Sequence, residues 1–111
     1  MELYRSISLE ESEDLEATGI FRAKEGQYEG KLFASSFADA CKFGLGFFKL
    51  DQKPFVIVKV TIDDEHTRDF SYEYYDEYLV DGLTIGVDRD YLNLLNQNMI
   101  FEILDFVQFT F

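Results

Sequence analysis

The sequence is poor in several residue types that mark particular classes of protein. It has one cysteine, one proline, one histidine and no tryptophan in 111 residues. A single cysteine cannot form an internal disulfide, which fits a reducing compartment. No apolar run approaches the roughly 20 residues that span a bilayer, and the first residues lack the basic and apolar regions of a signal peptide. We therefore expect a cytosolic protein without a membrane segment.

Positive charge is also scarce. Ten Lys and Arg residues stand against 22 Asp and Glu residues, which gives a net charge of −12 at pH 7. This excess repels nucleic acids and anionic membranes, because their phosphate groups carry the same sign. It attracts a basic protein surface and speeds encounter with it, and it also keeps a small domain dispersed in water. The charge therefore predicts no direct binding to nucleic acid or membrane, and it is compatible with a basic protein partner.

Apolar residues, by contrast, are plentiful. Hydrophobic residues make up 47% of the chain, including twelve Phe and seven Tyr. That is enough for a packed core, so global disorder is excluded. The length suits one domain over residues 1–111.

The first half of the chain alternates short strands and helices. Residues 2–7 alternate as a strand does. Ser8, with Glu11 three residues later, has the pattern of a capping box at the start of a helix that Gly19 ends. We then predict a polar loop at residues 22–30 and a short strand at 31–35. A helix is expected to start at Ser36 and to end near Phe43, before Gly44 and Gly46. A β-branched strand is predicted at 55–62.

The second half predicts fewer elements. A short strand is expected at 83–87, a helix capped by Asp88 up to Gln97, and a terminal strand over 99–111. This last strand carries its apolar residues on one face, interrupted by Asp105, where we expect a bend or bulge. Residues 63–81 are ambiguous. The fold class is thus α+β, with a mostly antiparallel sheet of five or six strands and two or three helices.

Three segments carry a resemblance to a known family. They are Leu-Tyr-Arg-Ser-Ile-Ser at 3–8, Thr-Gly-Ile-Phe at 18–21 and Gly-Lys-Leu-Phe-Ala-Ser-Ser at 30–36. Their order resembles the front half of ADP-ribosyltransferases, over about residues 3–62. The resemblance implies an ADP-ribosyltransferase-like fold, NAD as cofactor, and an active or degenerate member such as a bacterial or phage effector.

The resemblance also implies roles for individual residues. Arg5 would hold the phosphate or ribose of NAD, and a guanidinium binds phosphate well through paired hydrogen bonds. Ser35 and Ser36 would lie in the same cleft, and Phe33 would stack on the nicotinamide. Glu102 would be the catalytic carboxylate, which stabilises positive charge on the ribose as the glycosidic bond breaks.

Two positions depart from the family pattern, and each residue also has a plainer interpretation. Ala34 replaces the first serine of the family's second-strand motif, and Ile100 replaces the Gln or Glu expected two residues before Glu102. Arg5 alone is typical of a surface ion pair. The two serines are typical of a helix N-cap, and Glu102 of the solvent face of a strand.

A second candidate site is a cluster of tyrosines and acids within residues 63–81. Tyrosine offers a large contact area, so this mixture is typical of an interface. An immunity protein, an antitoxin or a nucleic-acid mimic would use such a surface against a basic protein. The plainer interpretation is a loop with its tyrosines packed inward. The candidate residues are Tyr72, Glu73, Tyr75, Asp76 and Glu77.

The remaining reactive residues predict no site. His66 lies among adjacent acids without ligand spacing, so we expect a solvated loop and no metal. Cys41 lies among small helical residues, which favours packing over nucleophilic chemistry. Gly44 and Gly46 follow a helix, so they are not a dinucleotide-binding fingerprint.

Overall fold

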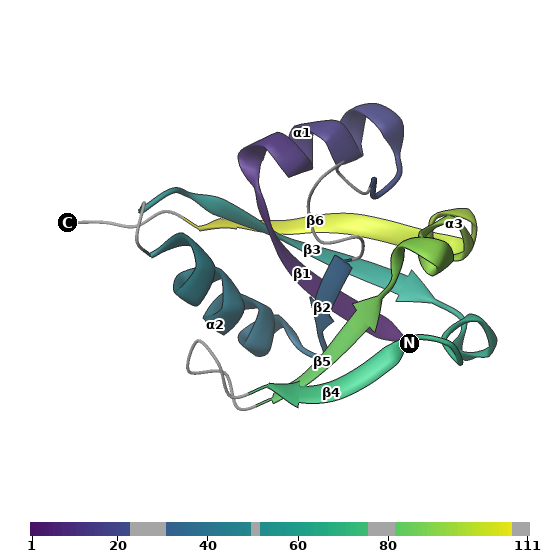
Figure 1. The fold of residues 1–111 in the computed structure, drawn as a ribbon. Coiled ribbons are helices and arrows are strands. Elements are labelled where there is room, and N and C mark those ends of the chain that lie inside the picture. Colours follow the sequence, from purple (N-terminus) through teal and green to yellow (C-terminus); the bar gives the residue numbers. More distant parts are fainter. Residues whose placement is uncertain (23–30, 50–51, 76–81, 108–111) are drawn as a thin grey trace.

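The computed structural model describes residues 1–22, 31–49, 52–75 and 82–107, and within this part the chain forms one six-stranded antiparallel sheet with three α-helices (Figure 1). The α+β class predicted from the sequence is therefore confirmed. The strand order is β4-β5-β2-β1-β3-β6. The elements are β1 (Glu2–Ser8), α1 (Leu9–Thr18), β2 (Lys31–Ala34), α2 (Phe37–Phe48), β3 (Phe55–Ile62), the 3-10 turn η1 (Asp64–His66), β4 (Ser71–Tyr75), β5 (Gly82–Val87), α3 (Arg89–Asn98) and β6 (Met99–Val107).

Helices cover both faces of the sheet. α1 and α3 bury Leu15 and Leu95 against one face, and α2 buries Ala40 and Phe43 against the other. Strand β3 lies between the two layers and is buried on both sides, since Val58 faces α1 and α3 while Ile57 faces α2. The strand predicted at 55–62 is thus confirmed, and both of its faces are apolar because both are covered.

Two helix starts follow the predicted capping chemistry. The Ser8 Oγ accepts the backbone N–H of Glu11 at 3.1 Å, and the Ser36 Oγ accepts the backbone N–H of Asp39 at 3.1 Å. Gly19 ends α1 with φ 75° and donates its N–H to the Leu15 carbonyl, which confirms its role as a C-terminal stop. Asp88 precedes α3, as predicted, although its side chain makes no capping hydrogen bond.

The predicted end of α2 was wrong. The helix continues through Gly44 and Gly46 to Phe48. A Cβ atom at Gly44 would lie 2.2 Å from the Phe55 ring, so this glycine allows the helix to pack closely on the sheet. Close packing of the helix on β3 outweighs the weak helix propensity of glycine.

Strand β6 contains the predicted irregularity. Val58 pairs with Ile103 but Ile57 pairs with Asp105, so Leu104 is an extra residue and forms a bulge. The extra residue reverses the alternation. Ile103 therefore packs on the α1 and α3 side, whereas Val107 packs on the α2 side, and the prediction of one apolar face along the whole strand was wrong beyond the bulge. Residues 108–111 lie outside the described part.

The segment left ambiguous by the sequence contains η1 and the edge strand β4. Of the predicted loop 22–30, only Arg22 lies within the described residues. None of the helices in the described ranges is long and apolar enough to cross a membrane.

Candidate functional site

Arg5, Glu11 and Lys31 form an ion-pair cluster where β1 and β2 separate. These two strands pair at Tyr4 and Ala34. Arg5 donates from Nε and Nη2 to the two carboxylate oxygens of Glu11, at 2.9 and 3.0 Å, and from Nη1 to the Leu32 carbonyl at 2.8 Å. Lys31 Nζ lies 3.5 Å from Glu11 Oε1. The guanidinium of Arg5 is therefore engaged within the chain.

The carboxyl group of Glu11 is held ionised by its two cations. Burial by itself raises the pKa of Glu11, but the hydrogen bond and charge of Arg5, together with Lys31, leave the pKa below its ordinary value. The side chains of Arg5 and Glu11 are 19% and 18% exposed, so solvent screens their attraction only in part. The cluster fastens α1 to β1 and β2.

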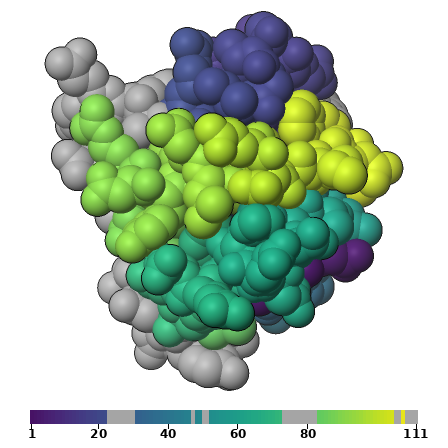
Figure 2. Space-filling model, turned by 90° about the vertical axis from the view of Figure 1, so that its right-hand side faces the viewer, coloured from purple at the N-terminus to yellow at the C-terminus, as the bar shows by residue number. Residues whose placement is uncertain are grey.

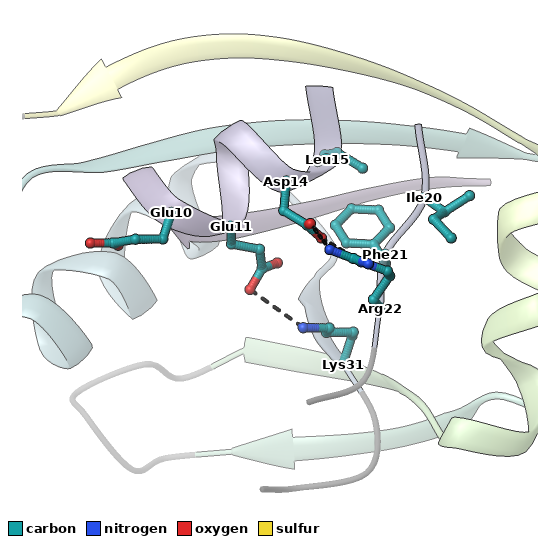
Figure 3. A pocket seen from close by; sticks show the side chains of 8 residues that line it. All are labelled: Glu10, Glu11, Asp14, Leu15, Ile20, Phe21, Arg22 and Lys31. Carbon is teal, nitrogen blue, oxygen red and sulfur yellow. Dashed lines mark hydrogen bonds and ion pairs between the residues drawn. The ribbon is translucent and has the colours of Figure 1, made fainter. Parts of the chain in front are cut away.

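A cavity of about 350 Å³ lies beside this cluster (Figure 3). Its apolar wall includes the buried Leu15 and Phe21. Arg22 donates a hydrogen bond of 2.9 Å from Nε to Asp14 Oδ2, so charges of both signs line the cavity. The lining residues are Glu10, Glu11, Asp14, Leu15, Ile20, Phe21, Arg22 and Lys31.

The residues that the resemblance assigns to NAD do not share one cleft. Phe33 is 1% exposed and contacts the ring of Phe21 edge-on, with centroids 5.5 Å apart, so it is part of the core. Ser36 caps α2, and Ser35 is exposed at the end of β2. Arg5 contacts Glu11 and Phe33 contacts Phe21, two residues that line the cavity, but neither Arg5 nor Phe33 lines it.

Glu102 lies on the opposite face of the sheet from Arg5. Glu102 pairs with Lys59, and Lys59 pairs with Tyr4. Paired residues project to the same face and neighbours along a strand to opposite faces, so Glu102 shares the α2 side with Tyr4. Arg5, next to Tyr4, projects to the α1 side. The predicted carboxylate and guanidinium are thus separated by the sheet.

The predicted tyrosine-rich cluster is only partly described. Tyr72 lies on β4, is 42% exposed, and donates its hydroxyl to the Thr67 carbonyl at 3.0 Å. Glu73 and Tyr75 belong to the same strand, but their side chains lie outside the described part. Asp76 and Glu77 also lie outside it.

Beside this strand, two acidic segments distant in sequence meet at one end of the molecule. The turn η1 contacts the helix α3, and Figure 2 shows them side by side. We call the exposed carboxylates here the acidic face. Two exposed cations, Arg68 and Arg89, lie within the same segments. The acidic face consists of Asp63, Asp64, Glu65, Asp69, Asp88 and Asp90.

Sequence reasoning missed the contribution of α3 to this surface. Asp88 and Asp90 lie at the start of α3, a helix that only tertiary packing brings against η1. The signal available in the sequence was their position at the start of a predicted helix, where the helix dipole favours acidic side chains.

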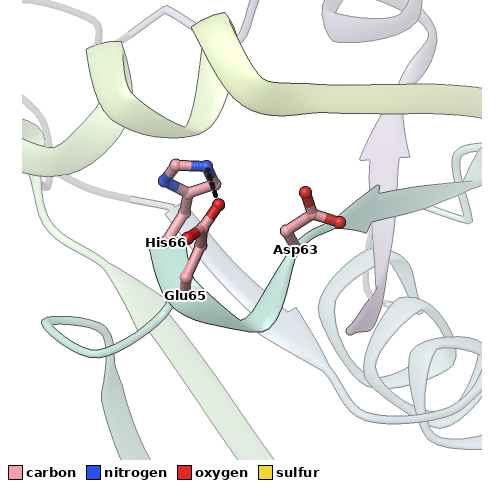
Figure 4. A group of neighbouring side chains, drawn as sticks. All are labelled: Asp63, Glu65 and His66. Carbon is pink, nitrogen blue, oxygen red and sulfur yellow. Dashed lines mark ion pairs between the residues drawn. The ribbon is translucent and has the colours of Figure 1, made fainter.

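Within the acidic face, three side chains of metal-binding types lie together (Figure 4). The donor atoms of Asp63, Glu65 and His66 all lie within 4.8 Å of one another. Nε2 of His66 is 3.4 Å from Glu65 Oε1. Both carboxylates are open to solvent, and all three residues come from η1 and its preceding residue.

Comparison with protein-family models gave no matching family, and searches of curated proteins and of solved structures gave no match.

Proposed function

We propose that this chain is a binding protein whose acidic face binds a basic protein. The observation that carries this proposal is the contact of η1 with α3, which brings two acidic segments together at one end of the molecule. Six exposed carboxylates lie in these segments together with two arginines, and Asp64 pairs with the N-terminal ammonium at 2.9 Å. A concentrated negative field accelerates encounter with a positive surface and selects against acidic proteins.

The distribution of positive charge supports a partner that approaches from the side of the acidic face. Lys42, Lys49 and Lys53 are exposed on α2 and just after it, and Figure 1 places α2 and η1 at opposite sides of the molecule. A partner with a basic cleft would therefore approach the acidic face first.

The proposed class of partner is a protein whose basic cleft normally binds phosphates, such as a nuclease. Exposed carboxylates would occupy positions that phosphates occupy in its substrate. The chain would then act as a non-enzymatic inhibitor, as an immunity protein, an antitoxin or a nucleic-acid mimic does.

The experiment uses a 16-residue peptide of alternating lysine and serine as a defined basic probe. Calorimetry at 20 mM NaCl compares the wild type with the triple variant Glu65→Lys, Asp69→Lys, Asp90→Lys. The matched control is Glu10→Lys, Glu13→Lys, Glu16→Lys on α1, which changes the net charge equally. We expect at least tenfold weaker binding for the acidic-face variant and less than threefold for the control. Equal weakening would show that net charge alone acts, and would contradict the proposal.

A second candidate function is NAD binding by a degenerate ADP-ribosyltransferase-like protein. Two observations favour it: the order of elements from β1 to β3 is the one that the resemblance implies, and Arg5 lies where β1 and β2 separate. Against it, Arg5 is already paired with Glu11.

Titration calorimetry with NAD tests this candidate. If it is right, the wild type binds millimolar NAD, Arg5→Ala abolishes binding, and Glu102→Gln leaves it unchanged because Glu102 projects from the other face. A wild type that takes up no NAD at that concentration ends this candidate and leaves the first one intact.

A further inference from the structure

Strand β6 forms one outer edge of the sheet. It pairs with β3 on its inner side, and no strand in the described ranges pairs with its outer side. Edge strands in monomeric proteins are usually short, charged or covered, because their free N–H and C=O groups attract other strands. At nine residues, β6 is long for an uncovered edge.

The side chains of β6 are also unusually apolar for such a position. Its sequence, Met-Ile-Phe-Glu-Ile-Leu-Asp-Phe-Val, has two charged residues, Glu102 and Asp105. Ile100 is 75% exposed and Leu104 is 38% exposed. An apolar edge with free backbone groups is a surface that a partner strand can complete.

The surroundings of Ile100 are uncovered on the α2 side of the sheet. Its pairing partner Thr61 is exposed, and so is the neighbouring Glu102. Helix α2 instead contacts the sheet at Phe55 and Ile57, at the other end of β3. Among the described residues, this part of the α2 side of the sheet is therefore open to solvent.

We propose that the outer edge of β6 binds an extended segment of a basic protein as a seventh strand. Apolar side chains of this segment pack on Ile100 and Leu104, and its lysines or arginines lie beside Glu102. The inference shares a basic partner with the proposed function but places the contact on a different surface.

Charge selects this occupant over a second copy of the chain. Pairing two β6 edges would bring together two molecules of net charge −12 and would place their Glu102 carboxylates near each other. Like charges across a strand pair are destabilising. A basic segment instead gains attraction from the same carboxylate and from the field of the whole molecule.

The test is an NMR titration of the ¹⁵N-labelled chain with the capped peptide Lys-Val-Arg-Val-Lys-Val-Arg. The control peptide has the same composition and charge, but every second residue has the D configuration, which prevents a regular strand. We expect the largest amide shifts within 99–107 and at least tenfold weaker binding of the control. Ile100→Ser should weaken binding of the first peptide about threefold or more.

The other results each overturn the proposal. Equal binding of the two peptides would show attraction by charge alone. Shifts confined to 63–69 and 88–90 would place the peptide on the acidic face, which leaves the proposed function standing while the β6 site fails. A dimer in sedimentation at 100 µM that Ile100→Lys abolishes would show that a second copy covers the edge.

Discussion

Glu11 joins three segments of the chain through a single carboxylate. The sequence indicated a capping residue, and the Ser8 half of that motif is present. The carboxylate of Glu11, however, binds Arg5 and Lys31. Since both cations are largely buried, removing the negative charge leaves them without compensation.

We predict that Glu11→Gln lowers the free energy of unfolding by about 2–4 kcal/mol, because a buried ion pair loses one partner. Glu13→Gln, an exposed change on the same helix, should stay within about 0.5 kcal/mol. Urea denaturation at pH 7 measures both. Equal effects would show that the cluster contributes nothing.

The effect of Glu11 should depend on pH with a defined sign. Its pKa in the folded protein is lowered, so its stabilisation is complete above the ordinary carboxyl pKa of about 4.3. That stabilisation is lost as pH falls through the lowered value. The gap between wild type and Glu11→Gln should therefore shrink on acidification. A gap that widens in acid would contradict this assignment.

Alanine substitutions of Ser35 and Ser36, the two serines of the predicted cofactor site, should differ in their effects on stability. Ser36→Ala removes the side-chain acceptor for the Asp39 N–H and should cost about 1 kcal/mol. Ser35→Ala, one residue earlier and exposed, should change the free energy of unfolding by less than about 0.3 kcal/mol, as exposed substitutions usually do. Thermal unfolding of the two variants provides the measurement.

At the scale of elements, α2 shows how packing overrides local propensity. Its glycines are typical of the end of a helix, yet the helix continues because Gly44 packs against the ring of Phe55. The same ring stacks on Phe48, with ring centroids 5.3 Å apart. The close approach of helix and strand depends on the missing side chain.

Gly44→Ala should therefore destabilise the protein by about 1–3 kcal/mol through overpacking, although alanine favours a helix by about 1 kcal/mol. Lys42→Ala, exposed on the same helix, should change stability by less than about 0.5 kcal/mol. Denaturant titration distinguishes them. A stabilised Gly44→Ala would mean that the ring of Phe55 moves aside easily.

Local patterns predicted those elements whose signals are complete within a few residues. The caps at Ser8 and Ser36, the stop at Gly19 and the β-branched run of β3 are of this kind. The length of α2, the reversal after Leu104 and the placement of Glu102 depend on which strands are neighbours. Sequence spacing carries no such information, so the predicted meeting of Arg5 with Glu102 could not be tested without the sheet order.

The acidic side chains of the whole molecule repel one another, and added salt should weaken this repulsion. Its radius of gyration is 13.3 Å, which is shorter than the Debye length of roughly 30 Å at 0.01 M salt and longer than the roughly 8 Å at 0.15 M. At low salt, therefore, most of the charges act on one another.

We expect the free energy of unfolding to rise by roughly 1 kcal/mol between 10 and 150 mM NaCl, because screening weakens repulsion within the compact state. The triple variant Glu65→Lys, Asp69→Lys, Asp90→Lys, with half of the net charge removed, should respond less. Chemical denaturation with urea, which adds no ions, is the suitable measurement. Lower stability at 150 mM would indicate that ion pairs outweigh repulsion.

The sheet order has a consequence for synthesis on the ribosome. The strand translated first, β1, lies between β2 and β3, and translation finishes the sheet with β6 at its rim. The nascent chain can thus assemble β1, β2 and β3 early, whereas β4 can join the sheet only after its partner β5 is made. Until β6 is synthesised, the outer edge of β3 has no pairing strand. A chaperone would protect the nascent chain most effectively during this interval.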